Sequence, residues 1–216
     1  MVHFKDRKEA GILLADKLKD IKEAIVLPLP RGGVVLGVEI AKILGSELDL
    51  MIVRKIGHPY QPEYAIGAIN EIGEMIGNEE ALIQVDKMWL QRIIESERRE
   101  AVNRRNKYLK GRQRISLQDK NVILVDDGIA TGLSMALAAR MARKMGAKKI
   151  IIAVPVAPEG AVRMLSQYAD EIVTLEVAAE DAFLGAVGAY YDDFRQVEDE
   201  EVIELLKEEG GRQKDE

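Results

Sequence analysis

The stretch that decides the fold is Val122-Ile123-Leu124-Val125-Asp126-Asp127-Gly128-Ile129-Ala130-Thr131-Gly132. It opens with four apolar residues, a pattern that predicts a strand covered on both faces, as in a parallel sheet. Two adjacent carboxylates follow, and a loop of small residues then leads into a helix expected over residues 133–145. Ligands bind open parallel sheets where the strands end, so we expect the binding site at this loop.

Strands and helices alternate on both sides of this stretch. Apolar residues at helical spacing and glycine stops predict helices over residues 7–24, 34–44, 86–110, 133–145, 159–166 and 198–208. Short apolar runs predict strands over residues 25–29, 48–53, 64–69, 81–85, 121–125, 149–154 and 171–177, with a loop at 57–62. The alternation favours an α/β fold, an open and mostly parallel twisted sheet with helices on both faces.

We expect a single domain over residues 1–209. Residues 56–118 would form a lid or insertion, and residues 178–200 would form a small hood together with the N-terminal segment. Residues 210–216 are too polar to pack and are expected to be a disordered tail.

Composition narrows the class of protein. The chain has 216 residues, 47% of them hydrophobic, which is enough for a full core. A net charge of -6 provides no general positive field for nucleic acid, and the absence of cysteine excludes disulfides and cysteine nucleophiles. The first residues are too polar for a signal peptide, and no apolar run approaches the roughly 20 residues that span a bilayer. We therefore expect a cytoplasmic protein with neither nucleic acid nor membrane as a partner.

The loop after residue 125 has the chemistry to hold a sugar phosphate. Adjacent carboxylates can accept hydrogen bonds from two vicinal hydroxyl groups. Backbone N–H groups of small residues, at the start of a helix, can bind a phosphate. An ordinary turn with an aspartate N-cap would use similar residues, so the loop alone leaves both interpretations open.

The complete stretch resembles the phosphoribosyl pyrophosphate signature of type I phosphoribosyltransferases. In that family the two acids hold the ribose 2′ and 3′ hydroxyls and the loop holds the 5′-phosphate. The resemblance assigns the first role to Asp126 and Asp127, and the second to Gly128, Ile129, Ala130, Thr131 and Gly132. Many members have Gly-Thr next, whereas this chain has Leu133-Ser134, and Ser134 can still donate a hydroxyl.

Two further segments match the family. Pro30-Arg31-Gly32-Gly33 corresponds to its pyrophosphate loop, in which glycines let the backbone approach an anion and Arg31 neutralises charge. Arg54-Lys55 corresponds to a basic position on the pyrophosphate. A simple Gly-Gly turn and two surface cations are the alternatives. The resemblance implies that Asp126, Asp127, Arg31 and Lys55 are the catalytic residues.

The resemblance also implies the reaction. The phosphoribosyl group of phosphoribosyl pyrophosphate would pass to a small, nitrogenous acceptor and release pyrophosphate, with Mg²⁺ held mainly through the ligand and by no direct protein contact. Enzymes acting on 6-oxopurines place an aspartate where this chain has Ala130, which argues against hypoxanthine and guanine. A non-catalytic sensor of phosphoribosyl pyrophosphate is the alternative, although Arg31 and Lys55 favour turnover.

The acceptor pocket is the weakest part of the pattern. Residues 187–195 faintly resemble the hood of purine phosphoribosyltransferases, which predicts that Phe183, Tyr190 or Tyr191 stacks on the acceptor and that Asp192 lies near the metal. Aromatic anchors for a C-terminal segment are equally consistent with this stretch. Residues 53–57, with Pro62-Glu63, look closest to a little-characterised branch of predicted phosphoribosyltransferases.

The arginine-rich helix at 86–110 also carries glutamates that balance much of its charge. It is expected to border the site or to pack against a second subunit. A homo-oligomer is therefore one of the two alternatives for this helix.

Overall fold

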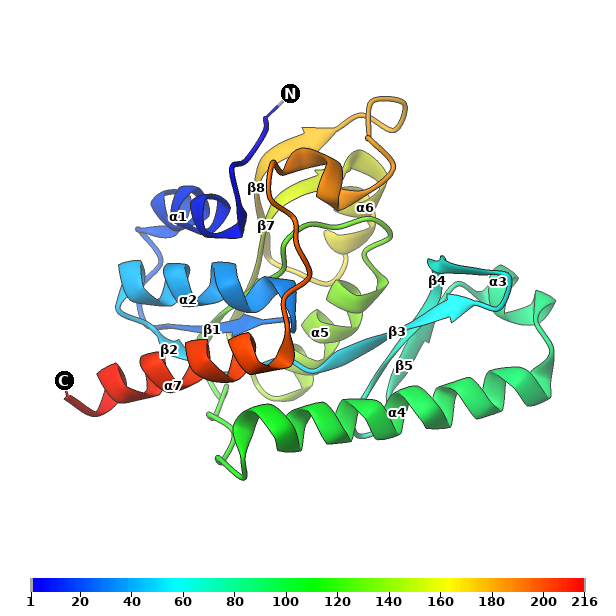
Figure 1. Cartoon of the computed structure of the whole chain (residues 1–216), viewed down its shortest axis with the longest axis horizontal. Coiled ribbons are helices and arrows are strands. Elements are labelled where there is room, and N and C mark those ends of the chain that lie inside the picture. The colour runs from blue at the N-terminus through cyan, green and yellow to red at the C-terminus, as the bar shows by residue number, and fades with distance from the viewer. Residues whose placement is uncertain (1, 216) are drawn as a thin grey trace.

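A parallel five-stranded sheet forms the centre of the computed structural model, which describes residues 2–215 except for the side chains of Glu63 and residues 210–215 (Figure 1). The strand order is β2-β1-β6-β7-β8. The strands are β1 (Ala24–Pro28), β2 (Glu47–Leu48), β6 (Asn121–Val125), β7 (Lys149–Pro158) and β8 (Glu171–Ala178). The predicted α/β class and parallel sheet are confirmed.

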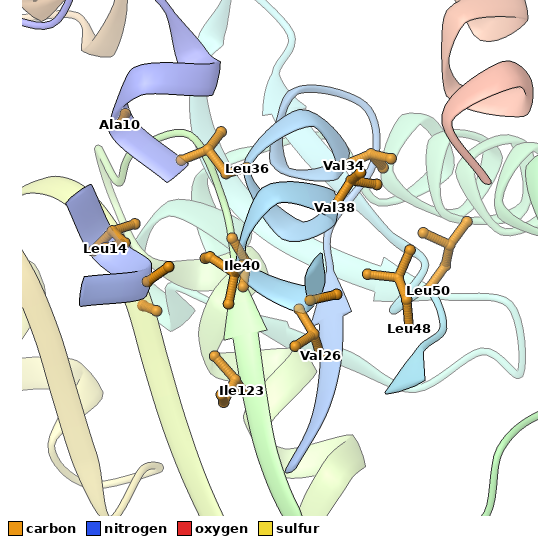
Figure 2. Close-up of a cluster of buried hydrophobic side chains, with 14 of the residues drawn as sticks. Ala10, Leu14, Val26, Val34, Leu36, Val38, Ile40, Leu48, Leu50 and Ile123 are labelled. Carbon is orange, nitrogen blue, oxygen red and sulfur yellow. The ribbon is translucent and has the colours of Figure 1, made fainter. Parts of the chain in front are cut away.

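Alternation along the strands separates two hydrophobic clusters. In β6, Ile123 and Val125 pack on the side of α1 (Arg7–Leu18) and α2 (Gly32–Leu44), where Figure 2 shows Ile123 with Val26 and the helix residues. Val122 and Leu124 pack on the opposite side, with α5 (Leu133–Lys144) and α6 (Glu159–Leu165). Successive side chains point to opposite faces of a strand, so a continuous apolar run is what a sheet between two helical layers requires.

A second, antiparallel sheet extends to one side of the first (Figure 1). It consists of β3 (Val53–His58), β4 (Gln61–Asn70) and β5 (Met75–Gly77), and it packs against α4 (Lys87–Leu109), with α3 (Glu79–Gln84) at its end. We call these elements the lid. Its separate buried cluster contains Ile56, Ile66, Ile69 and Val85.

Two predictions in the lid are wrong. Residues 81–85 were expected to be a strand, but α3 covers Glu79–Gln84 because the Asn78 side chain accepts a hydrogen bond from the Ala81 N–H and two glutamates occupy the first turn. The expected loop at 57–62 is largely the end of a hairpin, with strand register shifts beside Gly57 that accommodate the turn.

The strand predicted over residues 48–53 is divided between the two sheets. Only Glu47–Leu48 is a strand beside β1, although the Met51 N–H still donates to the Pro28 carbonyl at 3.2 Å. Val53 already begins β3. Asp49 marks the division, because its carboxylate accepts hydrogen bonds from the N–H groups of Leu50 and Ile115.

The two ends of the chain lie on the α1 and α2 side. Phe4 pairs with Tyr191 in an isolated parallel bridge, so the N-terminal segment lies beside the stretch that follows β8. The last helix, α7 (Asp199–Asp215), packs against α2 and α4. Its backbone is helical as far as Asp215, where a disordered tail was expected from residue 210. No helix of the described part combines the length and apolarity that crossing a membrane requires.

Candidate active site

Two loops meet because β1 and β6 are neighbours in the parallel sheet. Pro28 is in register with Val125 at the carboxyl ends of these strands, and the Leu29 N–H donates to the Val125 carbonyl at 2.8 Å. The Pro30–Gly33 segment therefore lies directly beside the Asp126–Gly132 loop, although about ninety residues separate them in the sequence.

Glycine is required where these loops touch. A Cβ on Gly32 would lie 1.9 Å from Oδ2 of Asp127, and a Cβ on Gly33 would lie 2.7 Å from the Val125 carbonyl oxygen. The peptide between Pro30 and Arg31 is cis. The glycine pair thus permits backbone-to-carboxylate packing that any larger residue would prevent.

The second loop ends at the N-terminus of a helix. Gly132 has φ +79°, in the left-handed region, and precedes α5 directly. The Ile129 N–H is fixed by a 2.9 Å hydrogen bond to the Val156 carbonyl on β7. The loop therefore presents small residues and the positive end of the α5 dipole to one side of the sheet.

A cavity of about 400 Å³ lies at this loop. Most of the predicted phosphate-binding residues line it, together with one acid and one cation: Lys55, Asp126, Gly128, Ile129, Ala130, Thr131, Gly132 and Ser134. Residues that were not predicted complete the wall, namely Ala65, Met135, Gly185, Ala186, Val187, Gly188 and Phe194. The cavity therefore joins the main sheet, the lid and the hood region.

The two adjacent acids occupy different surroundings. Asp126 lines the cavity, whereas Oδ2 of Asp127 accepts a 2.8 Å hydrogen bond from Nε of Arg7. Burial raises the pKa of Asp126 well above its usual range, and the charge of Asp127 raises it further. Burial also raises the pKa of Asp127, while Arg7 acts in the opposite direction.

Of the three cations predicted to contact the ligand, one lines the cavity and two do not. Lys55 lines the cavity, but its neighbour Arg54 points to the other face of β3, where Nε donates to Glu97 of α4 at 2.7 Å. Arg54, a predicted ligand contact, therefore does not line the cavity, because strand alternation directs it to the other face. Arg31 lies 3.6 Å from Glu198 and from Asp199 and does not line the cavity.

The residues predicted to contact the acceptor do not line the cavity. The Tyr190 ring is fully buried, and Phe183 packs beside it with ring centroids 5.8 Å apart. Asp192 faces the solvent and lies 3.2 Å from Nδ1 of His3. These aromatic rings anchor the segment, the alternative that the pattern had left open.

The aromatic residue that reaches the cavity is Phe194. Sequence reasoning missed it, although the stretch containing it had been marked. Gly128 packs against Val187, and Gly188 packs against Phe194 so closely that a Cβ would clash with each neighbour. These contacts, which the sequence pattern does not reveal, bring residues 185–194 over the phosphate loop.

The charges of α4 are largely paired within the described chain. Arg98 pairs with Glu95 and Arg104 pairs with Glu100. Lys107 donates to Asp199 of α7 at 2.7 Å. The arginine-rich sequence of this helix is thus explained by ion pairs that support the lid and attach it to α7.

The described residues bring no three metal-ligating side chains together. The cavity offers the Asp126 carboxylate, and Asp127 already pairs with Arg7. Magnesium prefers oxygen ligands and usually takes several of them from phosphates and water. This donor set fits an ion that a phosphorylated ligand brings with it.

Comparison with known proteins agrees with this geometry. The family model described as "Phosphoribosyl transferase domain" matches residues 7–193. A Mycobacterium tuberculosis protein, provisionally named as a phosphoribosyl transferase, is 40% identical over 207 residues, which is 94% of this chain and 46% of that protein. The chain thus spans about half the length of this curated relative.

Two other similarities are informative. The crystal structure of the protein TT1426 from Thermus thermophilus superposes with a TM-score of 0.78 at 42% identity, covering 96% of this chain and 99% of that one. A ribose-phosphate pyrophosphokinase of Thermococcus kodakarensis is 43% identical over only 60 residues, 27% of this chain and 21% of that enzyme. The family match extends over most of the chain and includes both the Pro30–Gly33 segment and the Asp126–Gly132 loop at the cavity. The chain therefore belongs to the phosphoribosyl transferase family.

Proposed function

We propose that the protein is a phosphoribosyltransferase that uses phosphoribosyl pyrophosphate with Mg²⁺ and transfers the phosphoribosyl group to a nitrogenous acceptor. The observation that carries this proposal is the cavity in which Asp126 and the Gly128–Gly132 loop lie together at the end of β6. One carboxylate and one phosphate-binding loop on the same turn suit a sugar phosphate better than either group alone.

Each part of the donor has a candidate partner. The 5′-phosphate would accept hydrogen bonds from the N–H groups of the loop at the start of α5, and a ribose hydroxyl would donate to Asp126. Lys55 lies where its positive charge can stabilise the leaving pyrophosphate. Bound magnesium would supply further charge neutralisation at the pyrophosphate oxygens.

The chemical step is a displacement at the anomeric carbon. The bond from C1 to the pyrophosphate oxygen breaks, the acceptor nitrogen forms a new bond to C1, and pyrophosphate leaves with the bonding electrons. Positive charge develops on the ribose ring during this step, so a fixed carboxylate such as Asp126 and a neutralised leaving group lower the barrier.

The acceptor would lie against residues 185–188 and Phe194 in the same cavity. Ala130 lines the cavity at the position where enzymes acting on 6-oxopurines carry an aspartate, and it offers no group to exchange a proton. We therefore place the acceptor outside the 6-oxopurines.

Pyrophosphate release with a panel of nitrogenous acceptors tests the proposal, in parallel with calorimetric titration of phosphoribosyl pyrophosphate. An enzyme binds the donor and releases pyrophosphate with at least one acceptor, whereas a sensor binds it without turnover. Asp126→Asn should abolish both signals, and Asp20→Asn, an exposed substitution just beyond the far end of α1, should alter neither. Absence of donor binding by the unmodified protein would contradict the proposal.

A further inference from the structure

Asp127 accepts hydrogen bonds from two residues that are distant in the sequence and do not line the cavity. Its Oδ2 accepts from Nε of Arg7 at 2.8 Å, and its backbone carbonyl accepts from the Tyr191 hydroxyl at 2.6 Å. Arg7 is the first residue of α1, and Tyr191 lies three residues before Phe194, which lines the cavity. The acid loop is thus attached to the start of α1 and to the segment between β8 and α7.

Arg7 is itself fixed at three points. Besides the ion pair, its Nη1 donates to the Arg195 carbonyl at 2.8 Å, and its guanidinium lies 3.8 Å from the centroid of the Phe194 ring. Only 8% of the residue is exposed. A planar guanidinium can form these contacts simultaneously, which a lysine ammonium cannot.

The pairing makes the two acids unequal. With Asp127 directed towards Arg7, Asp126 is the carboxylate that lines the cavity. Two adjacent buried carboxylates repel each other, and a buried cation beside one of them offsets that repulsion. The Asp127 N–H also donates to Oδ1 of Asp126 at 2.9 Å, so a shift of Asp127 would move Asp126 with it.

We propose that Arg7 is a positioning residue, which fixes Asp127 and through it directs Asp126 and the phosphate loop towards the donor. Arg7 contacts Asp127 and does not line the cavity, so it is not a catalytic residue. This inference rests on the proposed function, since it concerns the site for the same donor. It predicts that donor affinity depends on a residue 120 positions away from the acid it holds.

A double-variant cycle tests the inference, with Mg²⁺-dependent binding of phosphoribosyl pyrophosphate measured by calorimetry at 25 °C. Arg7→Gln should weaken binding about 100-fold, the effect expected when a group shifts by about 1 Å. Arg7→Lys keeps the charge but loses the second hydrogen bond and the stacking, so a loss of about tenfold is expected. Lys8→Gln, the adjacent and exposed cation on α1, should bind as the unmodified protein does.

The decisive comparison is made in the Asp127→Asn background. If Arg7 acts through Asp127, adding Arg7→Gln there should weaken binding by less than twofold, because the interaction has already been removed. An additional loss of about 100-fold in the double variant, or unchanged affinity in Arg7→Gln, would overturn the inference. A general loss of folding would lower the fraction of active sites and the melting temperature, but not the affinity of the remaining folded protein.

The outcomes separate this inference from the proposed function. If the unmodified protein does not bind the donor, both fail. If it binds and the cycle shows independent effects, the proposed function stands and the role of Arg7 falls. Should Arg7→Gln not fold, the same comparison with Arg7→Lys gives the answer, because an effect that persists in the Asp127→Asn background contradicts the inference.

Discussion

The main sheet and the lid contribute to the same cavity but are built differently. The main sheet is covered by two large hydrophobic clusters, and its loops touch through glycines with no room for a side chain. The lid has its own small cluster, and it contributes Lys55 and Ala65 from antiparallel strands. Regions with few buried contacts open at lower free energy. We therefore expect the main sheet to form the more rigid wall of the cavity, and the lid to form the wall that opens at lower free energy.

The largest effect should come from the rigid wall. Asp126→Asn is expected to lower kcat/KM about 100- to 1,000-fold, because both the ribose contact and a fixed charge near the reacting carbon are lost. The same substitution should stabilise the protein at pH 7, since burial and the charge of Asp127 raise the pKa of Asp126. Steady-state turnover and urea unfolding measure the two effects.

The pH dependence of that stability gain follows from the direction of the shift. A raised pKa means that the folded state binds the proton more tightly, so stability falls as the pH rises above the ordinary aspartate pKa of about 4. The advantage of Asp126→Asn should thus be present at pH 7 and shrink as the pH falls towards 4. If the variant were less stable than the unmodified protein at pH 7, burial of the charged Asp126 carboxylate would not be destabilising the folded state.

The next effect tests the contact between the loops. Gly32→Ala places a methyl group 1.9 Å from Oδ2 of Asp127, so the loops must separate, and donor affinity should fall about 100-fold. Gly45→Ala at the other end of α2 meets no atom within 4 Å, and its φ of +61° costs about 1 kcal/mol. Calorimetry should show weakened binding in the first variant only.

A smaller effect is expected from the lid. Lys55→Gln should lower kcat/KM about tenfold, because the residue lines the cavity and its positive charge is lost. Arg54→Gln should instead leave kcat/KM intact and lower stability by about 1 kcal/mol, because its ion pair with Glu97 is lost. Equal effects of the two substitutions on turnover would contradict the assignment of the two faces of β3.

The smallest effect concerns the hood region. Tyr190→Phe removes a hydroxyl that accepts a hydrogen bond from the Leu184 N–H at 3.3 Å, so it should cost about 1 kcal/mol of unfolding free energy or less. Because the ring is buried, KM for any acceptor should change less than twofold. A tenfold rise in that KM would restore Tyr190 as an acceptor contact.

Sequence reasoning succeeded where the information is local. The apolar run of β6, the acids and the glycine-bounded loop are contiguous, so strand, turn and helix follow from periodicity and turn chemistry. The short helix α3 was mistaken for a strand, because a five-residue apolar segment has no clear period. Its signal was the Asn78 cap with two glutamates after it.

The rest of the site depends on contacts between distant residues. Arg7 meets Asp127 across 120 positions, and Phe194 reaches the cavity only because Gly188 lets it pack closely. Tyr190 and Phe194 are both aromatic and only four residues apart, yet one is core and the other lines the cavity. Tertiary packing decides between them, and neither composition nor spacing encodes that choice.

Titration of phosphoribosyl pyrophosphate into the unmodified protein, with and without Mg²⁺, tests the central claim most directly. The account predicts saturable binding at one site per chain that requires magnesium and is lost in Asp126→Asn. Binding that survives this substitution unchanged, or no binding at all in the presence of magnesium, would contradict it.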